Sequence, residues 1–263
     1  MNSAYLSSSK ILTENPCLDD FHMHTHDFYE IYCFISGNAK YYVEGNIYNL
    51  KSGDILFIKK SEAHTLQLTS DSDYERVIIN FNTDAVVNKE TQTILSEFDS
   101  LPLGKGNRFP FSLFKNKHWH YYIDKMLSRD NEESKRLYLT VLVNEMYECR
   151  NEALLVCGEQ DAVADIIAYI NSNITEAMTL ESICEKFYIS KSQINRKFRN
   201  VTGSTVWEYI TAKRLILAKE LLVRGEKPTS VYTKCGFNDY TSFYRAYKTK
   251  FLHSPKNDYI KLY

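Results

Sequence analysis

The chain has 263 residues, which is long enough for two domains with separate cores. Its 32 Lys and Arg nearly balance its 33 Asp and Glu, so the chain as a whole is not a strongly basic nucleic-acid-binding protein. No apolar run approaches the ~20 residues of a membrane span, and Met1–Lys10 is polar and rich in Ser. The sequence therefore predicts neither a membrane protein nor a signal peptide.

The charges are unevenly distributed along the chain. Residues 161–263 contain 16 Lys and Arg and 10 Asp and Glu, which leaves 16 and 23 of the two totals for residues 1–160. A basic C-terminal part attached to an acidic N-terminal part is typical of a DNA-binding module joined to a control module. The six cysteines form no CxxC pair and no regular spacing, so we expect reduced thiols and a cytoplasmic protein.

Short apolar segments separated by Gly and Asn turns fill the region from about Phe21 to Phe81. The turns are too short for helical crossovers, so we expect antiparallel strands in a sandwich or barrel. The expected strands are Glu30–Ser36, Lys40–Val43, Ile47–Leu50, Ile55–Ile58, His64–Leu68 and Arg76–Phe81.

A polar motif, His24-x-His26-x-x-x-Glu30, lies at the start of this region. On a strand, two residues that are two apart point to the same face, so we expect His24 and His26 to lie side by side. The motif resembles the first motif of the cupin barrels, and residues 53–64 resemble the second. The resemblance implies a cupin-like barrel over about residues 10–110. In the metal-binding cupins it implies the ligands His24, His26, Glu30 and His64.

The second motif departs from the cupin pattern, because Lys59-Lys60-Ser61 stands where Pro and Gly are usual. Several interpretations of the motif stay open: a polar pocket for a small organic effector, a metal site, histidines that are only structural, or a domain that serves only to dimerise. We favour the effector pocket, with no metal and no cofactor. Its expected lining is His24, His26, Glu30, Tyr32, Tyr42 and His64.

The pattern becomes helical from about residue 115 to residue 157. The spacing predicts one helix over His118–Leu127 and a longer one over Glu133–Leu155. The longer helix either packs on the barrel or pairs with its copy in a homodimer. Residues 158–162 are a plausible linker, and Asp165–Asn173 predicts the first helix of the C-terminal domain.

One local pattern occurs twice in the C-terminal part, at an offset of 49 residues. The order apolar, basic, aromatic, basic is formed by Ile194, Arg196, Phe198 and Arg199, and again by Phe243, Arg245, Tyr247 and Lys248. An upstream helical segment and a short break precede each copy. The segments are Leu180–Lys186 and Thr229–Cys235, and the breaks end at Ser190 and Asp239, both good helix N-caps. Helix, tight turn and second helix form the helix-turn-helix motif.

Each second helix has a polar face opposite its apolar stripe. Arg and Asn are suited to reading base edges in the major groove, and hydroxyl groups and Lys to holding phosphates. We expect Arg196 and Arg245 to contact bases and Arg199 and Lys248 to contact phosphates. Further candidates for DNA contact are Ser192, Asn195, Tyr240, Thr241 and Ser242.

Between the two copies, Val206–Leu222 predicts one long helix that ends before Gly225 and Pro228. About 17 residues at ~1.5 Å each give a length of roughly 25 Å. That length is of the right order to place two helices in successive major grooves, which lie about 34 Å apart.

Residues 179–259 resemble the DNA-binding domain of the AraC/XylS family of bacterial transcription regulators. The resemblance is carried by Leu180, Ile183, Ser190, Phe198, Gly203, Tyr209, Arg214, Ala218, Leu221 and Leu222, and then by Gly236, Phe237, Asp239, Phe243, Arg245, Tyr247, Ser254 and Pro255. It implies two helix-turn-helix units that are joined by a rigid helix and read adjacent grooves on one face of the DNA.

The sequence departs from this family at four places. Cys184 and Thr233 stand where the family usually has Ala, and Leu252 replaces a Gly that normally ends the second recognition helix. Asp258 occupies the place of an expected aromatic residue, which is shifted to Tyr259. We expect the tail after Phe251 to pack unusually, with the groove-facing positions unaffected.

These observations predict an α+β protein of two domains. Residues 1–157 form a cupin-like regulatory domain, with a barrel and two following helices, and residues 163–263 form an all-α tandem helix-turn-helix domain. The expected function is sequence-specific regulation of transcription, with duplex operator DNA and a small-molecule effector as partners and with no catalytic residues. Two alternatives remain: a metal-dependent cupin enzyme fused to a DNA-binding domain, and an architectural protein that binds DNA without sequence preference.

Overall fold

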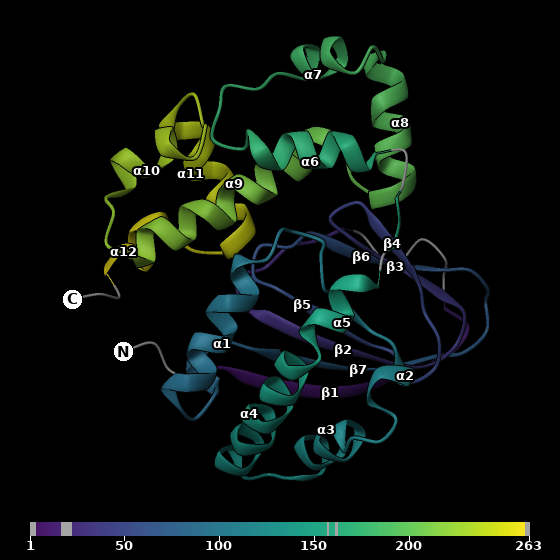
Figure 1. Cartoon of the computed structure of the whole chain (residues 1–263). Helices are drawn as coiled ribbons and strands as arrows, with labels where there is room; N and C mark the ends of the chain where they lie inside the picture. Colours follow the sequence, from purple (N-terminus) through teal and green to yellow (C-terminus); the bar gives the residue numbers. More distant parts are fainter. Residues whose placement is uncertain (1–3, 17–22, 157, 161–162, 261–263) are drawn as a thin grey trace. The chain divides into compact units, whose positions relative to one another are not determined.

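In the computed structural model, which describes residues 4–16, 23–156, 158–160 and 163–260, the chain forms two compact units (Figure 1). The first is rich in β-structure and consists mainly of Phe28–Gln160, and the second is helical and consists mainly of Asp161–Tyr263. This arrangement confirms the predicted fold class. Within the described residues, no helix combines the length and the apolar character needed to cross a bilayer.

The β-rich unit contains two antiparallel sheets with strand orders β1-β7-β2-β5-β8 and β6-β3-β4-β9. The two sheets share no strand among the described residues, so the expected barrel takes the form of two facing sheets. The strands are β1 (Leu6–Thr13), β2 (Tyr29–Ser36), β3 (Ala39–Val43), β4 (Asn46–Asn49), β5 (Ile55–Ile58), β6 (His64–Leu68), β7 (Tyr74–Phe81), β8 (Arg108–Phe109) and β9 (Glu159–Gln160).

Strands β2 to β7 agree with the six strands expected from the sequence, but other elements differ. Strand β1 was not expected; it pairs along its whole length with β7, from Leu6 opposite Phe81 to Thr13 opposite Tyr74. Part of the expected linker forms β9, which pairs with Asn46 and Ile47 of β4. Residues 161 and 162 of that linker lie outside the described residues.

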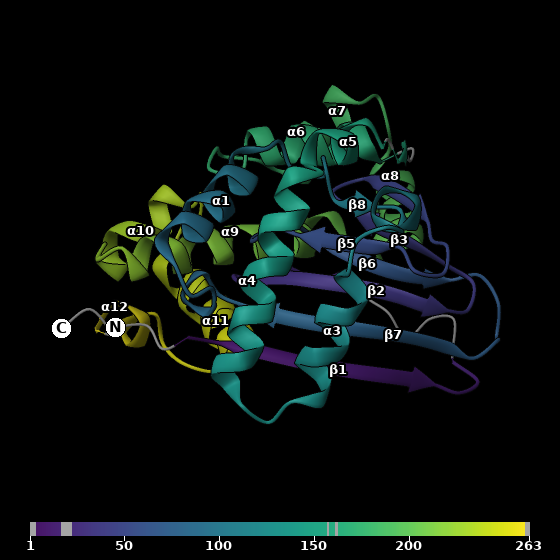
Figure 2. The same ribbon diagram turned by 60° about the horizontal axis from the view of Figure 1, so that its bottom comes forward.

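Helices cover one face of the five-stranded sheet, and the second sheet covers its other face (Figure 2). Ile31, Phe57 and Ile79 point towards the helices, whereas Tyr32, Leu56 and Tyr74 point towards the second sheet. This alternation follows from the two-residue period of a strand. The helices of this unit are η1 (Thr83–Ala85), α1 (Lys89–Ser100), α2 (Phe111–Phe114), α3 (Trp119–Ser128), α4 (Glu132–Glu148) and α5 (Arg150–Leu155).

The helix that the sequence predicted over 133–155 is divided into α4 and α5 in the structure, so the prediction of one continuous helix was wrong. Cys149 ends α4, with its N–H donating to the carbonyl oxygens of Met146 and Tyr147. Cys149 and Ala153 are both buried against the core of this unit.

The helical unit contains two helix pairs on either side of one long helix, α9, as Figure 1 shows. The helices are α6 (Ala164–Ser172), α7 (Leu180–Lys186), α8 (Lys191–Thr202), α9 (Val206–Val223), α10 (Pro228–Lys234), α11 (Tyr240–Phe251) and α12 (Pro255–Ile260). Helix α9 has 18 residues, which corresponds to about 27 Å. It packs against α8 on one side and against α10, α11 and α12 on the other.

Candidate functional site

The first helix-turn-helix unit consists of α7 and α8. Ser190 starts α8 with a reciprocal capping box, in which its Oγ accepts from Gln193 N–H and the Gln193 side chain accepts from Ser190 N–H. The turn before it contains Tyr188 in a left-handed conformation, with φ of +52°. Ile194 and Phe198 of α8 are fully buried. The cap and the buried stripe together fix which face of α8 is turned outward.

The outward face of α8 carries the side chains that the sequence predicted for DNA contact. Ser192, Arg196 and Arg199 are exposed, and Asn195 is half-buried. Lys191 forms an ion pair with Glu181 of α7, which ties the start of α8 to the preceding helix. Two guanidinium groups and two neutral hydrogen-bonding groups therefore lie on one exposed surface.

The second helix-turn-helix unit consists of α10 and α11. Asp239 caps α11, with its Oδ1 accepting from Ser242 N–H at 2.8 Å, and this bond is the first cause that lowers the pKa of Asp239 below its ordinary value. Phe243 and Tyr247 are fully buried. The outward residues are Tyr240, Thr241, Ser242, Tyr244, Arg245 and Lys248, all of them exposed.

Aromatic rings distinguish the outer surface of α11 from that of α8. The ring centroids of Tyr240 and Tyr244 are 6.1 Å apart, and Tyr240 also contacts Tyr232 of α10 edge-on at 5.8 Å. At the position of Tyr244, one repeat earlier, α8 has Asn195. The two outer faces thus share their basic residues but differ in their neutral ones.

Arg214 in the middle of α9 ties two other segments of the helical unit to this helix. Its guanidinium donates to the carbonyl oxygens of Ile174, Glu176 and Gly236, at 2.9, 2.7 and 2.6 Å. Gly236 has φ of +80°, and a Cβ at this position would lie 2.8 Å from the guanidinium. Burial lowers the pKa of Arg214 from its ordinary value, and the three carbonyl oxygens compensate the buried charge.

The unusual residues of the C-terminal tail have defined places. Leu252 ends α11 in a left-handed conformation with φ of +63°, and 87% of its surface is exposed. Asp258 is buried and accepts a hydrogen bond from the Tyr247 hydroxyl at 2.5 Å. Where the family usually has an aromatic residue, Asp258 therefore makes a polar contact with Tyr247 of the buried stripe of α11.

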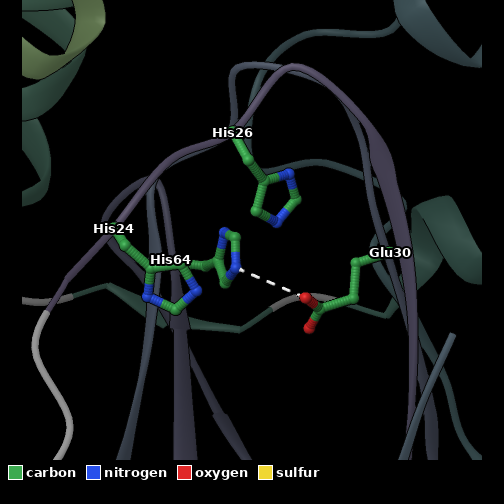
Figure 3. A group of neighbouring side chains, drawn as sticks. All are labelled: His24, His26, Glu30 and His64. Carbon is green, nitrogen blue, oxygen red and sulfur yellow. Dashed lines mark ion pairs between the residues drawn. The ribbon is translucent and has the colours of Figure 1, made fainter. Parts of the chain in front are cut away.

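In the N-terminal part, the structure brings His24, His26, Glu30 and His64 together (Figure 3). One ligand atom from each residue lies within 4.8 Å of those of the other three. Glu30 is the second residue of β2 and His64 the first residue of β6. His24 and His26 precede β2, whereas the sequence had suggested that they lie within a strand. They nevertheless lie side by side as expected, with their ring centroids 6.0 Å apart. Their segment is polar and lacks the apolar alternation that would fix a strand to a sheet.

The orientation of the His64 ring is set by the backbone. Its Nδ1 lies 2.9 Å from the carbonyl oxygen of Glu62, and a carbonyl oxygen can only accept, so Nδ1 carries the proton. The Nε2 atom faces Glu30, whose Oε2 lies 4.0 Å away. His64 and Glu30 are both buried, whereas His24 is exposed. The cluster therefore has a buried side and a side that is open to solvent.

Tyrosine side chains surround Glu30 on the inner face of the sheets. The hydroxyl of Tyr41 donates to Glu30 Oε1 at 3.2 Å, and the Tyr41 ring stacks on His64. Tyr32 and Tyr74 form a hydroxyl pair nearby, and burial raises the pKa of both. Tyr42 lies on the opposite face of β3 from Tyr41, because neighbouring strand residues alternate. The sequence reasoning had named Tyr42 and missed Tyr41.

The loop that departs from the cupin pattern is held by buried polar contacts. Glu62 accepts hydrogen bonds from the backbone N–H groups of Lys59 and Gly104 and from the Asn107 side chain. The Lys59 ammonium, also buried, forms an ion pair with Glu62 at 3.2 Å. Ser61 has φ of +65°, so it adopts a conformation that Gly would adopt more easily. These contacts place the start of β6, and with it His64.

An open pocket of about 570 Å³ lies elsewhere on the β-rich unit, beside α4. Its wall includes Tyr122, Leu137, Tyr138 and Val141. Leu137 and Val141, one helical turn apart, are 51% and 42% exposed. The sequence did not predict this pocket, because it forms only where α3 and α4 lie side by side.

Comparison with known proteins gave matches over both parts of the chain. The model of the AraC-like ligand binding domain matches residues 13–99, and that of a helix-turn-helix domain matches residues 183–258. Together, the two matches cover more than half of the chain. The HTH-type transcriptional activator RhaS of Escherichia fergusonii is 24% identical over 247 residues, covering 90% of this chain and 86% of the relative. RhaS of Mannheimia succiniciproducens is also 24% identical, over 254 residues, with 90% and 88% covered.

Among solved structures, wild-type ToxT from Vibrio cholerae with bound unsaturated fatty acid aligns with 15% identity and a TM-score of 0.42. The alignment covers 97% of this chain and 95% of ToxT.

Proposed function

The chain belongs to the AraC family of transcription regulators, and we propose that α8 and α11 read its operator while the cluster around Glu30 belongs to the site for its effector. The family fixes the general function: a helix-turn-helix domain that binds DNA, joined to an N-terminal ligand-binding domain. What the family leaves open is which side chains carry out each task.

The observation that carries the DNA-reading proposal is the position of Arg196 and Arg245. Each is exposed and follows a fully buried residue by two positions, Ile194 in α8 and Phe243 in α11. A side chain fixed in this way projects from the helix surface opposite the core. Arg is the residue best suited to a bidentate contact with guanine in the major groove. We therefore assign base reading to Arg196 and Arg245.

We assign phosphate contacts to Arg199 and Lys248, which lie one turn further along the same helices and are also exposed. Ser192, Asn195, Tyr240, Thr241 and Ser242 complete the two surfaces. The tyrosine rings of α11 offer apolar area to thymine methyl groups, whereas Asn195 of α8 offers an amide to adenine. The two halves of the operator should thus be read by different chemistry.

A gel-shift series on a selected operator, with each base pair replaced in turn, tests these roles. Arg196→Ala should weaken operator binding by about 1–3 kcal/mol and relax the preference at one or two positions. Arg199→Ala should weaken binding to all sequences and lower the salt slope by about one. Arg224→Ala removes an exposed positive charge at the end of α9 and is the matched control.

The architectural alternative makes the opposite prediction. It expects the Arg196→Ala and Arg224→Ala proteins to lose affinity equally on operator and random DNA, because only charge would count. That result would remove the base-reading role.

For the effector site we propose the polar cluster of His24, His26, Glu30 and His64, bordered by Tyr41 and Tyr32 on the inner side. Two observations support this proposal: the four side chains lie close together, and His24 at one end of the cluster is exposed. An effector that binds one conformation of the protein more tightly than the other shifts the population towards that conformation, and the DNA affinity changes with it. The difference between the effector's affinities for the two conformations limits the size of this change. Thermal-shift screening of small metabolites against wild type and Glu30→Gln tests this site, since a true effector stabilises only the wild type.

We further propose that two copies pair through α4. The support is the exposed apolar pair Leu137 and Val141, at a spacing of one helical turn, beside the open pocket. Sedimentation velocity should show a dimer that Val141→Asp dissociates, while Leu155→Asp, also exposed but on α5, leaves it intact. A wild-type chain that stays monomeric at high micromolar concentration refutes the pairing.

As a regulator that binds chromosomal DNA, the protein is expected in the bacterial cytoplasm. We assign it no catalytic step.

A further inference from the structure

We propose that the pocket beside α4 is a second ligand site, which binds a small organic acid with an apolar, ring-bearing body and one carboxylate group. Binding itself does not depend on the proposed function. Only its consequence, competition with a second copy of the chain, rests on the pairing proposed above.

The walls of the pocket come from three segments of the β-rich unit. Tyr122 lies on α3, and Leu137 and Val141 lie on α4. Val87 lies in the loop between η1 and α1, and its N–H donates to Thr140 Oγ1 of α4 at 3.0 Å. Helices α3 and α4 pack side by side across the sheet (Figure 2). Because packing and a hydrogen bond hold these walls, a ligand finds the pocket largely formed, as is usual for small-molecule sites.

The size and the lining of the pocket indicate a small organic molecule. Its volume of about 570 Å³ lies within the range of roughly 300–1,000 Å³ that small-molecule sites have. Leu137 and Val141 are exposed, so a ligand that covers them removes apolar surface from water. The rings of Tyr122 and Tyr138, with centroids 6.3 Å apart, add aromatic surface to the same wall. A ligand that carries an aromatic ring can pack against such a wall at similar centroid distances.

One cation at the pocket determines the sign of the ligand's charge. Arg129, at the end of α3, lines the pocket, and its guanidinium lies over the Tyr138 ring at 6.0 Å from the centroid. Its side chain is exposed, and no carboxylate among the described residues pairs with it. The other lining residues are uncharged. A guanidinium matches the geometry of a carboxylate with two parallel hydrogen bonds, so an organic acid is the ligand that suits this pocket.

Occupation of the pocket has a consequence for the oligomeric state. Leu137 and Val141 line the pocket and are also the residues through which two copies are proposed to pair. A ligand that covers them takes away the apolar surface that pairing needs. The ligand therefore binds the monomer more tightly than the dimer and shifts the population towards the monomer.

The binding experiment uses the full chain at low micromolar concentration and two probes, phenylbutyrate and phenylbutanol, in a ligand-observed NMR titration. The two probes share the ring and the chain, but only phenylbutyrate carries a charge. We expect phenylbutyrate to bind with a Kd of about 0.1–5 mM, which is normal for so small a ligand, and phenylbutanol to bind at least about 3-fold more weakly. Equal binding of the two probes, or no saturable binding of phenylbutyrate, overturns the proposal.

Substitutions at the pocket locate the bound acid. Arg129→Gln should weaken phenylbutyrate binding by about 3- to 10-fold and leave phenylbutanol binding unchanged. Lys125→Gln is the matched control, because Lys125 lies one turn earlier on α3 and also stands over a tyrosine ring, that of Tyr121 at 5.1 Å, but does not line the pocket. Circular dichroism checks that both proteins remain folded. An equal loss in the two variants would show that the acid responds only to surface charge, and it would refute the site.

Sedimentation velocity with and without phenylbutyrate separates this inference from the proposed function. Where the wild type pairs, saturating phenylbutyrate should dissociate the dimer, and Arg129→Gln should need a higher concentration for the same effect. A dimer that persists at saturation refutes the competition. A chain that stays monomeric, yet binds phenylbutyrate through Arg129, refutes the pairing and supports the ligand site.

Discussion

The end of α11 provides a sharp test of backbone strain. Leu252 adopts φ of +63°, and its N–H donates to the carbonyl oxygen of Lys248. The equivalent position one repeat earlier is Gly203, with φ of +70° and its N–H bonded to Arg199 O. The same helix ending is thus formed once by glycine and once by leucine. A side chain in this conformation crowds the following carbonyl and costs about 1–2 kcal/mol, whereas glycine adopts it freely.

Leu252→Gly should therefore stabilise the helical unit. Relief of backbone strain raises the free energy of unfolding by about 1–2 kcal/mol. The greater conformational freedom of glycine in the unfolded chain lowers it by about 0.5–1 kcal/mol. Little burial is lost, because the leucine side chain is 87% exposed. The net gain is about 0.5–1 kcal/mol, or roughly 2–8 °C in Tm for a unit of this size.

Thermal and urea unfolding of the full chain, followed by circular dichroism, measures this gain. Leu252→Ala is the matched control, since it removes the exposed side chain but keeps the Cβ that causes the strain. Gly203→Ala is the reverse change, and it should destabilise the unit by about 1 kcal/mol. If Leu252→Gly proves no more stable than Leu252→Ala, the strain argument is wrong.

Four further substitutions test individual contacts within the two units. Arg214→Met should lower the free energy of unfolding by about 3 kcal/mol or more, because three carbonyl oxygens lose a charged donor. Gly236→Ala should lower it by at least about 1 kcal/mol, because the added Cβ would lie too close to the Arg214 guanidinium. Denaturant unfolding measures both changes. Tyr247→Phe should cost about 1.5–3 kcal/mol by removing the donor to buried Asp258, and equal stability of the two proteins would contradict this role. Burial, opposed by a nearby carboxylate, lowers the pKa of His120. Its contribution to stability is therefore complete above pH ~6.5 and is lost as the pH falls below that value, so His120→Gln should flatten the stability profile between pH 7.5 and 5.5.

The sequence by itself predicted the helix-turn-helix elements closely, because their signals are local. Ser190 and Asp239 cap the helices within three residues, and the apolar spacing that includes Ile194 and Phe243 fixes which face is buried. The exposed faces follow directly, so Arg196 could be named as a groove-facing residue without coordinates. The same holds for β2 to β7, whose bounds are set by short turns.

What only the tertiary structure decided depends on residues that are far apart in the sequence. The role of Arg214 requires carbonyl groups from two segments that are about 60 residues apart in the sequence, and no local pattern encodes that meeting. Whether Tyr41 or Tyr42 faces Glu30 depends on the register of β3 against its neighbours, and a shift of one residue would exchange them. The proton position on His64 depends on a loop conformation held by Glu62. Local caps and periodicity act over a few residues and are visible in the chain, whereas register and long-range hydrogen bonds form only when the whole domain is packed.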